Sequence, residues 1–125
     1  MDKLKIAVVD DDNGFVEKLC LAVELAGFEA IPVFVAEDRT KGYVLKMIRG
    51  AQVILLDHSM PRFSGEDIAK LLRYDDDPPV LITTSDHDRA PLYTKHFLIG
   101  KGNYSPEGLS DSIRRKVGEI CESSI

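Results

Sequence analysis

The sequence lacks the features that mark several classes of protein. Its first hydrophobic run, Ile6 to Val9, has four residues, which is too few for a signal peptide or a membrane span. Only two cysteines occur, Cys20 and Cys121, with no C-x-x-C pair and no Cys/His cluster, which argues against a zinc site and a disulfide framework. These absences predict a cytoplasmic protein with reduced thiols.

Positive charge is also in deficit. Sixteen Lys and Arg residues stand against 21 Asp and Glu residues, which gives a net charge of −5. This sign opposes attraction to the phosphate backbone of nucleic acid and to anionic lipid. We therefore expect no direct partnership with nucleic acid or with a membrane.

The sequence does contain a regular series of short apolar runs. Five of them recur along the chain, at residues 6–9, 31–35, 53–56, 80–83 and 97–99. The runs are continuously apolar rather than alternating, as the strands of a parallel sheet covered on both faces must be. A chain of 125 residues has room for one core. The expected fold is α/β, a doubly wound five-stranded parallel sheet of the flavodoxin-like (βα)5 type, as a single domain over residues 1–125.

Segments with helical spacing and recognisable ends lie between the runs. The expected helices begin at Asp12 or Asn13, run over residues 37–49, begin near Ser64 and Gly65, run over residues 89–96, and begin at Ser105 and Pro106. Gly27 is expected to end the first helix and Gly50 the second. The expected core-facing positions are Phe15, Leu19, Val23, Ala26, Ile68, Leu71, Leu72, Leu109, Ile113, Val117 and Ile120.

Polar residues follow the predicted strands at their carboxyl ends, where open parallel sheets gather their ligands. These residues are Asp10-Asp11-Asp12 after the first strand, Asp57 after the third, Thr83-Thr84-Ser85 at the fourth and Lys101 after the fifth. Clustered carboxylates with no His or Cys suit Mg²⁺. The set predicts a metal-assisted phosphoryl site with a carboxylate nucleophile, and with a hydroxyl and an ammonium group for the phosphoryl oxygens.

The same motifs resemble those of the response-regulator receiver domain, the CheY-like family. Residues Lys5–Asp12 look like the family's first strand with its acidic pair, and Val53–Gly65 matches its phosphoacceptor block, D-x-x-M-P-x-x-x-G. Residues Pro79–Ser85 resemble the fourth strand with its switch hydroxyl, and Lys101 falls where the family has its active-site lysine. The resemblance spans the whole chain and is strongest up to residue 85.

The resemblance implies a place for the chain in a two-component phosphorelay. Asp57 would accept a phosphoryl group from a histidine kinase or a phosphotransfer protein. The Mg²⁺ would be held by Asp10, Asp11, Asp57 and the backbone carbonyl of Ser59.

Further roles are implied for Thr84 and Lys101, which would bind the phosphoryl oxygens. The chain would catalyse only its own phosphorylation and dephosphorylation, and so would not be an enzyme for other substrates. A change of its surface would carry the signal to a downstream protein or to an effector domain.

Two positions depart from the family pattern. Gly102 stands where the family has a proline after the lysine, and Leu98 stands where it has an aromatic residue that moves with the switch hydroxyl. Phe97 is adjacent, but in a regular strand a one-residue offset places it on the opposite face. These departures concern how phosphorylation would be passed on to a change of the surface, not phosphorylation itself.

Three other classes of function remain open from the sequence. A degenerate receiver that serves only as a docking module would fit Leu98 and Gly102, but not the complete acceptor set. A small Mg²⁺-dependent phosphatase would generally have a second acid two residues after the nucleophile, where Ser59 stands. A flavin or nucleotide binder would need a phosphate cradle after the first strand, where Asp10-Asp11-Asp12 would repel the phosphate.

Overall fold

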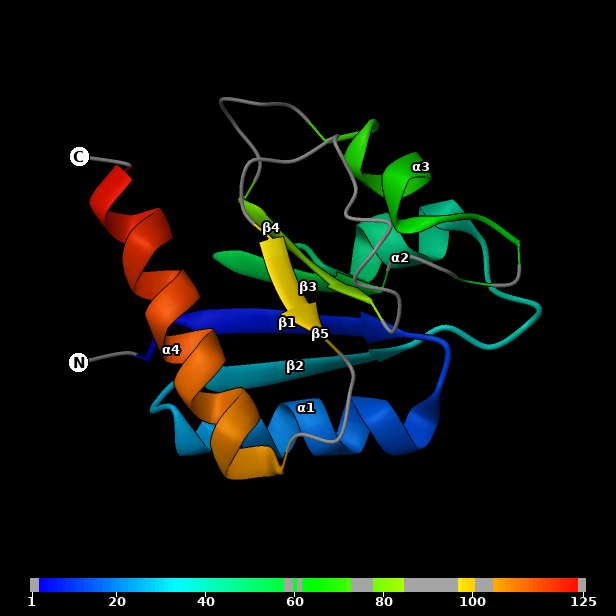
Figure 1. The fold of residues 1–125 in the computed structure, drawn as a ribbon. Helices are drawn as coiled ribbons and strands as arrows, with labels where there is room; N and C mark the ends of the chain where they lie inside the picture. The colour runs from blue at the N-terminus through cyan, green and yellow to red at the C-terminus, as the bar shows by residue number, and fades with distance from the viewer. Residues whose placement is uncertain are drawn as a thin grey trace.

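A sheet of five parallel strands forms the middle layer of the protein (Figure 1). The computed structural model describes residues 3–57, 60, 62–72, 78–84, 97–100 and 105–123. The strands are β1 (Lys5–Asp10), β2 (Glu29–Phe34), β3 (Val53–Asp57), β4 (Val80–Thr84) and β5 (Phe97–Gly100). Their order across the sheet is β2-β1-β3-β4-β5, which confirms the predicted doubly wound α/β fold.

Helices cover both faces of this sheet. They are α1 (Asn13–Leu25), α2 (Lys41–Met47), α3 (Gly65–Ala69) and α4 (Pro106–Ser123). Helices α1 and α4 pack against one face, and α2 and α3 pack against the other (Figure 1). Among the described residues, no helix combines the length and the apolar character needed to cross a lipid bilayer.

Each central strand contributes to two hydrophobic cores, because its side chains alternate between the two faces of the sheet. In β1, Ile6 and Val8 face the α1–α4 layer, whereas Ala7 and Val9 face the α2–α3 layer. All four side chains are at most 1% exposed. Burial on both faces explains why the strand sequences are continuously apolar.

The ends of α1 are set by local interactions that the sequence predicts. Asp12 caps the helix, since its Oδ1 atom accepts a hydrogen bond from the backbone N–H of Phe15 at 3.2 Å. Gly27, with a φ of 93°, takes the left-handed conformation that ends the helix. The fully buried residues of α1 are Val16, Leu19, Ala22 and Val23. Phe15 and Ala26, both predicted to face the core, are only partly buried.

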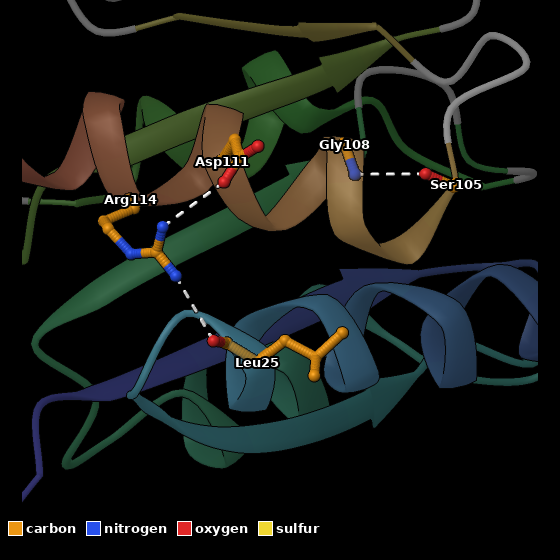
Figure 2. Close-up of polar contacts among 5 residues, drawn as sticks. All are labelled: Leu25, Ser105, Gly108, Asp111 and Arg114. Atoms are coloured by element: carbon orange, nitrogen blue, oxygen red, sulfur yellow. Dashed lines mark hydrogen bonds and ion pairs between the residues drawn. The ribbon is translucent and has the colours of Figure 1, made fainter.

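Helix α4 packs against α1 and is hydrogen-bonded to it. Ser105 caps α4 as predicted, with its Oγ atom accepting a hydrogen bond from the Gly108 N–H at 3.1 Å (Figure 2). The predicted core positions of α4 are all buried, namely Leu109, Ile113, Val117 and Ile120. Arg114 donates to the backbone carbonyl of Leu25 at 3.3 Å and pairs with Asp111 at 3.3 Å, so it joins the last residue of α1 to the outer face of α4 (Figure 2).

Helix α2 is shorter than the predicted span of residues 37–49. It begins at Lys41, because Thr40 acts as the cap by accepting a hydrogen bond from the Tyr43 N–H at 3.2 Å. It ends at Met47, before Gly50, whose φ is 89°. The predicted start at residue 37 is therefore wrong by four residues, because Thr40 caps the helix and the acidic segment before it does not.

Helix α3 begins at Gly65 as predicted but ends at Ala69. Ile68 is buried as expected, whereas Leu71 lies beyond the helix and is 52% exposed, so its predicted core position is wrong. Leu72 is partly buried against the core of the α2–α3 layer. The further helix predicted over residues 89–96 lies outside the described residues.

The pairing between β4 and β5 contains a register shift. Ile82 pairs with Phe97, but the next residue, Thr83, pairs with Ile99, so β5 has one extra residue at Leu98. Such a shift interrupts the regular alternation of side chains along a strand. Phe97 was predicted to face away from the position of Leu98 because a regular strand alternates, but β5 is not regular at this point.

The start of α3 provides a charge-dependent contribution to stability. The Ser64 Oγ accepts a hydrogen bond from the Asp67 N–H at 3.1 Å, and the Asp67 carboxylate accepts one from the Ser64 N–H at 2.9 Å, which forms a capping box. The Ser64 backbone N–H is the main cause that lowers the pKa of Asp67, and the positive charges of Lys41 and Lys70 contribute.

We therefore expect the Asp67→Asn variant to be less stable than the wild type at neutral pH. A lowered folded-state pKa means that this carboxylate stabilises the fold above its unfolded-state pKa, and that the benefit is lost as the pH falls through the folded-state value. The difference in unfolding free energy should thus begin to shrink near the ordinary Asp pKa of about 3.9 and disappear below the lower folded-state pKa. Urea unfolding of both proteins at several pH values measures it, and a difference independent of pH would contradict the capping-box charge as its cause.

Candidate functional site

Three carboxylates meet at the carboxyl ends of β1 and β3. Val9 of β1 pairs with Leu56 of β3, so the next residues, Asp10 and Asp57, end neighbouring strands. One carboxylate oxygen from each of Asp10, Asp11 and Asp57 lies within 4.8 Å of the others. We call these three residues the acidic cluster. The structure thus brings together the three acidic residues that the sequence analysis expected to meet.

The acidic cluster differs in exposure from one member to the next. Asp10 is 0% exposed and Asp57 is 3% exposed, whereas Asp11 is the most exposed of the three. The Asp10 Oδ1 accepts a hydrogen bond from the Asp12 N–H at 3.0 Å, which holds the start of the loop to α1 against the cluster. Asp12 itself is exposed and caps α1, so it belongs to the helix rather than to the cluster.

The acidic cluster fits a divalent cation that prefers oxygen ligands. Close carboxylates repel one another, and burial of two of them in the protein raises the free-energy cost of their charge. A bound cation removes both penalties, and an oxygen-only set without His or Cys is typical of Mg²⁺ rather than of zinc. The donors of the acidic cluster could therefore hold a cation of this kind.

A hydroxyl that the sequence analysis did not assign lies beside the cluster. Thr83 of β4 pairs in register with Asp57 of β3 and is 1% exposed. Asp10, Asp57 and Thr83 continue the positions of Val8, Leu55 and Leu81, which all face the α1–α4 layer. These three polar residues form a row across β1, β3 and β4 on one face of the sheet, which we call the polar row. The signal in the sequence was the consecutive Thr pair at the end of β4, but its register with Asp57 needed the sheet.

The remaining predicted site residues are only partly within the described residues. Thr84 is the last residue of β4, and its backbone lies opposite Gly100 of β5. Gly100 immediately precedes Lys101 in the sequence. Ser59 and Lys101, and also Gly102, lie outside the residues that the structure describes.

Cys20 is unsuited to nucleophilic chemistry. Cys20 is a free thiol on α1, and burial together with the nearby Glu24 carboxylate raises its pKa to about 11. A thiol with this pKa is protonated at neutral pH, and the thiolate is the reactive form. Cys20 is therefore not a candidate nucleophile.

Several curated proteins are similar to this chain in sequence. No family model matches the chain. It is 31% identical over 83 residues to the phosphate regulon transcriptional regulatory protein PhoB of Pseudomonas aeruginosa, covering 64% of this chain and 35% of that protein. It is 30% identical over 84 residues to the DNA-binding response regulator MtrA of Mycobacterium tuberculosis, covering 67% of this chain and 36% of that protein. The chain spans about a third of the length of these curated relatives.

Solved structures with the same fold cover almost the whole chain. The chemotaxis response regulator CheY4 of Vibrio cholerae superposes with a TM-score of 0.70 at 21% identity, covering 91% of this chain and 98% of that one. The response regulator PhyR of Brucella abortus gives a TM-score of 0.78 at 19% identity, covering 99% of this chain and 51% of that one. At this level of identity the structures show a shared fold.

The sequence relatives and the structural neighbours agree on one family. The curated relatives include response regulators, and the structural neighbours include receiver domains described as CheY-like. The strand order β2-β1-β3-β4-β5 is that of the CheY fold. The chain is a receiver domain of the CheY-like response-regulator family.

Proposed function

We propose that the chain accepts a phosphoryl group on Asp57 with the help of Mg²⁺ and passes the signal on through a change of its surface. The observation that carries this proposal is the acidic cluster, with two buried carboxylates at the carboxyl edge of a receiver-type sheet. Buried carboxylates cost free energy, so their retention side by side favours a binding role over a passive docking module.

The position of Asp57 supports its role as the acceptor. Strand β3 lies between β1, which ends at Asp10 and is followed by Asp11, and β4, which supplies Thr83 and Thr84. Asp57 therefore has acidic residues on one side and hydroxyl residues on the other. A nucleophile between a cation site and groups that bind phosphoryl oxygens suits phosphoryl transfer.

The transfer step forms one bond and breaks one bond. A carboxylate oxygen of Asp57 attacks the phosphorus of a phosphohistidine, the P–N bond breaks, and the imidazole leaves with the electron pair. The product is an acyl phosphate on Asp57. Bound Mg²⁺ would supply positive charge for the phosphoryl oxygens in this step.

We assign the supporting roles as the resemblance implies. The metal-holding groups are Asp10, Asp11, Asp57 and the backbone carbonyl of Ser59. Thr84 hydrogen-bonds one phosphoryl oxygen, and Lys101 pairs with the phosphoryl charge.

The proposed partners are a histidine kinase or a phosphotransfer protein as donor, and a downstream protein or effector domain as recipient. Residues 1–125 would act as one receiver domain. The net charge of −5 favours protein partners over direct contact with nucleic acid.

A first prediction concerns the cation. We expect Asp11→Asn to raise the melting temperature in the absence of Mg²⁺ by about 3 °C, because it removes one of three mutually repelling charges. The same variant should weaken Mg²⁺ binding by about tenfold or more, because a charged oxygen ligand is lost. Thermal unfolding in EDTA and calorimetric titration with Mg²⁺ measure the two effects.

Asp12→Asn is the matched control for that experiment. It makes the same change of net charge one residue away, outside the acidic cluster, and asparagine caps a helix as well as aspartate does. Mg²⁺ affinity should stay near that of the wild type. Equal losses of Mg²⁺ affinity in both variants would mean that general charge, not the cluster, attracts the cation.

A second prediction concerns covalent modification. Incubation of the wild type with acetyl phosphate and Mg²⁺ should add one phosphoryl group per chain, and Asp57→Asn should abolish this addition because the amide is not a nucleophile. Intact-mass spectrometry measures the outcome. Asp67→Asn, which alters an exposed carboxylate on α3, should be modified like the wild type. Undiminished labelling of Asp57→Asn would refute the acceptor assignment.

A further inference from the structure

We infer that Thr83 is a positioning residue of the acidic cluster, whose hydroxyl donates a hydrogen bond to the Asp57 carboxylate when a divalent cation is bound. The inference rests on the proposed function and adds to it a residue that no motif assigns. It concerns Thr83, not the neighbouring Thr84.

The placement of Thr83 is the first observation. Thr83 is the cross-strand partner of Asp57, and the pairing of β3 with β4 is regular from Ile54 opposite Val80 to Asp57 opposite Thr83. Paired residues of neighbouring strands lie about 4.8 Å apart. They also point to the same face of the sheet, so the Thr83 side chain belongs to the polar row beside the Asp57 side chain.

The state of the Thr83 hydroxyl is the second observation. Thr83 is 1% exposed, and its Oγ1 atom is buried with no hydrogen-bond partner among the residues that the structure describes. A buried hydroxyl without a hydrogen bond destabilises a protein, whereas valine has the same shape without that penalty. The position continues the apolar column of Leu81, where valine would pack without penalty.

Asp57 is the acceptor best placed to remove this penalty. An ionised carboxylate offers about four lone-pair sites and no donor, so it can serve a cation and a hydroxyl at once. Hydrogen bonds to a charged acceptor are also stronger than those between neutral groups. A small rotation of the Asp57 carboxylate on binding a cation would bring one of its oxygens to Thr83. The hydroxyl would then fix the orientation of the oxygen that holds the cation.

The test compares Thr83→Val and Thr83→Ser with the wild type, each with and without Mg²⁺. Valine removes the hydroxyl and keeps the shape, and serine keeps the hydroxyl and removes the methyl group. Thermal unfolding in EDTA, thermal unfolding in saturating Mg²⁺ and calorimetric titration with Mg²⁺ are measured for all three proteins.

In EDTA, Thr83→Val should melt at a higher temperature than the wild type, because an unsatisfied buried hydroxyl is gone. Its Mg²⁺ affinity should fall about tenfold, since the cation-bound state loses a hydrogen bond to a charged group. Thr83→Ser should bind Mg²⁺ within about twofold of the wild type while melting at a lower temperature in both conditions, because a buried methyl group is lost. A purely structural threonine would change the melting temperatures without changing Mg²⁺ affinity.

The outcomes separate this inference from the proposed function. If the wild type binds Mg²⁺ and Thr83→Val binds it equally well, the positioning role is wrong and the proposed function stands. If the wild type does not bind Mg²⁺ at all, the proposed function and this inference both fail. If Thr83→Ser loses as much Mg²⁺ affinity as Thr83→Val, packing of the methyl group explains the effect, and the hydrogen bond is refuted.

Discussion

The parallel pairing of β1, β3 and β4 is the constraint on which the candidate site depends. Its register aligns the last residues of three strands, so that Asp10, Asp57 and Thr83 fall into one row although they are far apart in the sequence. A slip of one residue in either pairing would turn one of these side chains to the opposite face of the sheet. The apolar residues below the row resist such a slip, because it would also expose core side chains. The hydrophobic core and the position of the acidic residues are thus determined together.

The polar row also sets a conflict between stability and function. The same strands that bury Val8, Leu55 and Leu81 carry buried carboxylates at their ends. Apolar residues at those ends would lengthen the core and remove the electrostatic cost. Residues that lower stability in this way are typical of functional sites.

Strands and caps were the features best predicted from the sequence, because each follows from local residues. The runs beginning at Ile6 and Val53 are apolar at every position, a pattern that strands need when both faces of the sheet are buried. Asp12 and Ser105 act as helix caps through their own side chains. The start of α2 was misplaced because the cap at Thr40 competes with other possible starts, and sequence alone does not rank them. Leu71 was misplaced because a helical pattern does not show where a helix stops.

The acidic cluster was predictable for a different reason. Strands in a parallel sheet all end at one edge, so knowing that Asp10 and Asp57 end strands was enough to bring them together. Thr83 was named among the hydroxyl residues at the end of the fourth strand but was given no role of its own, because that role depends on which residue lies opposite it. The extra residue at Leu98 in β5 was also hidden, since a register shift arises from pairing between strands and leaves no local mark.

The cap at Asp12 has a consequence for the electrostatics of this edge. Because α1 begins at Asn13 and is capped by Asp12, the N-terminal end of this helix lies close to Asp11 in the chain. The aligned peptide dipoles of α1 give that end of the helix a partial positive charge of about half an elementary charge. The helix therefore offsets part of the repulsion among the carboxylates. The backbone itself supplies a fraction of the positive charge that this edge of the sheet requires.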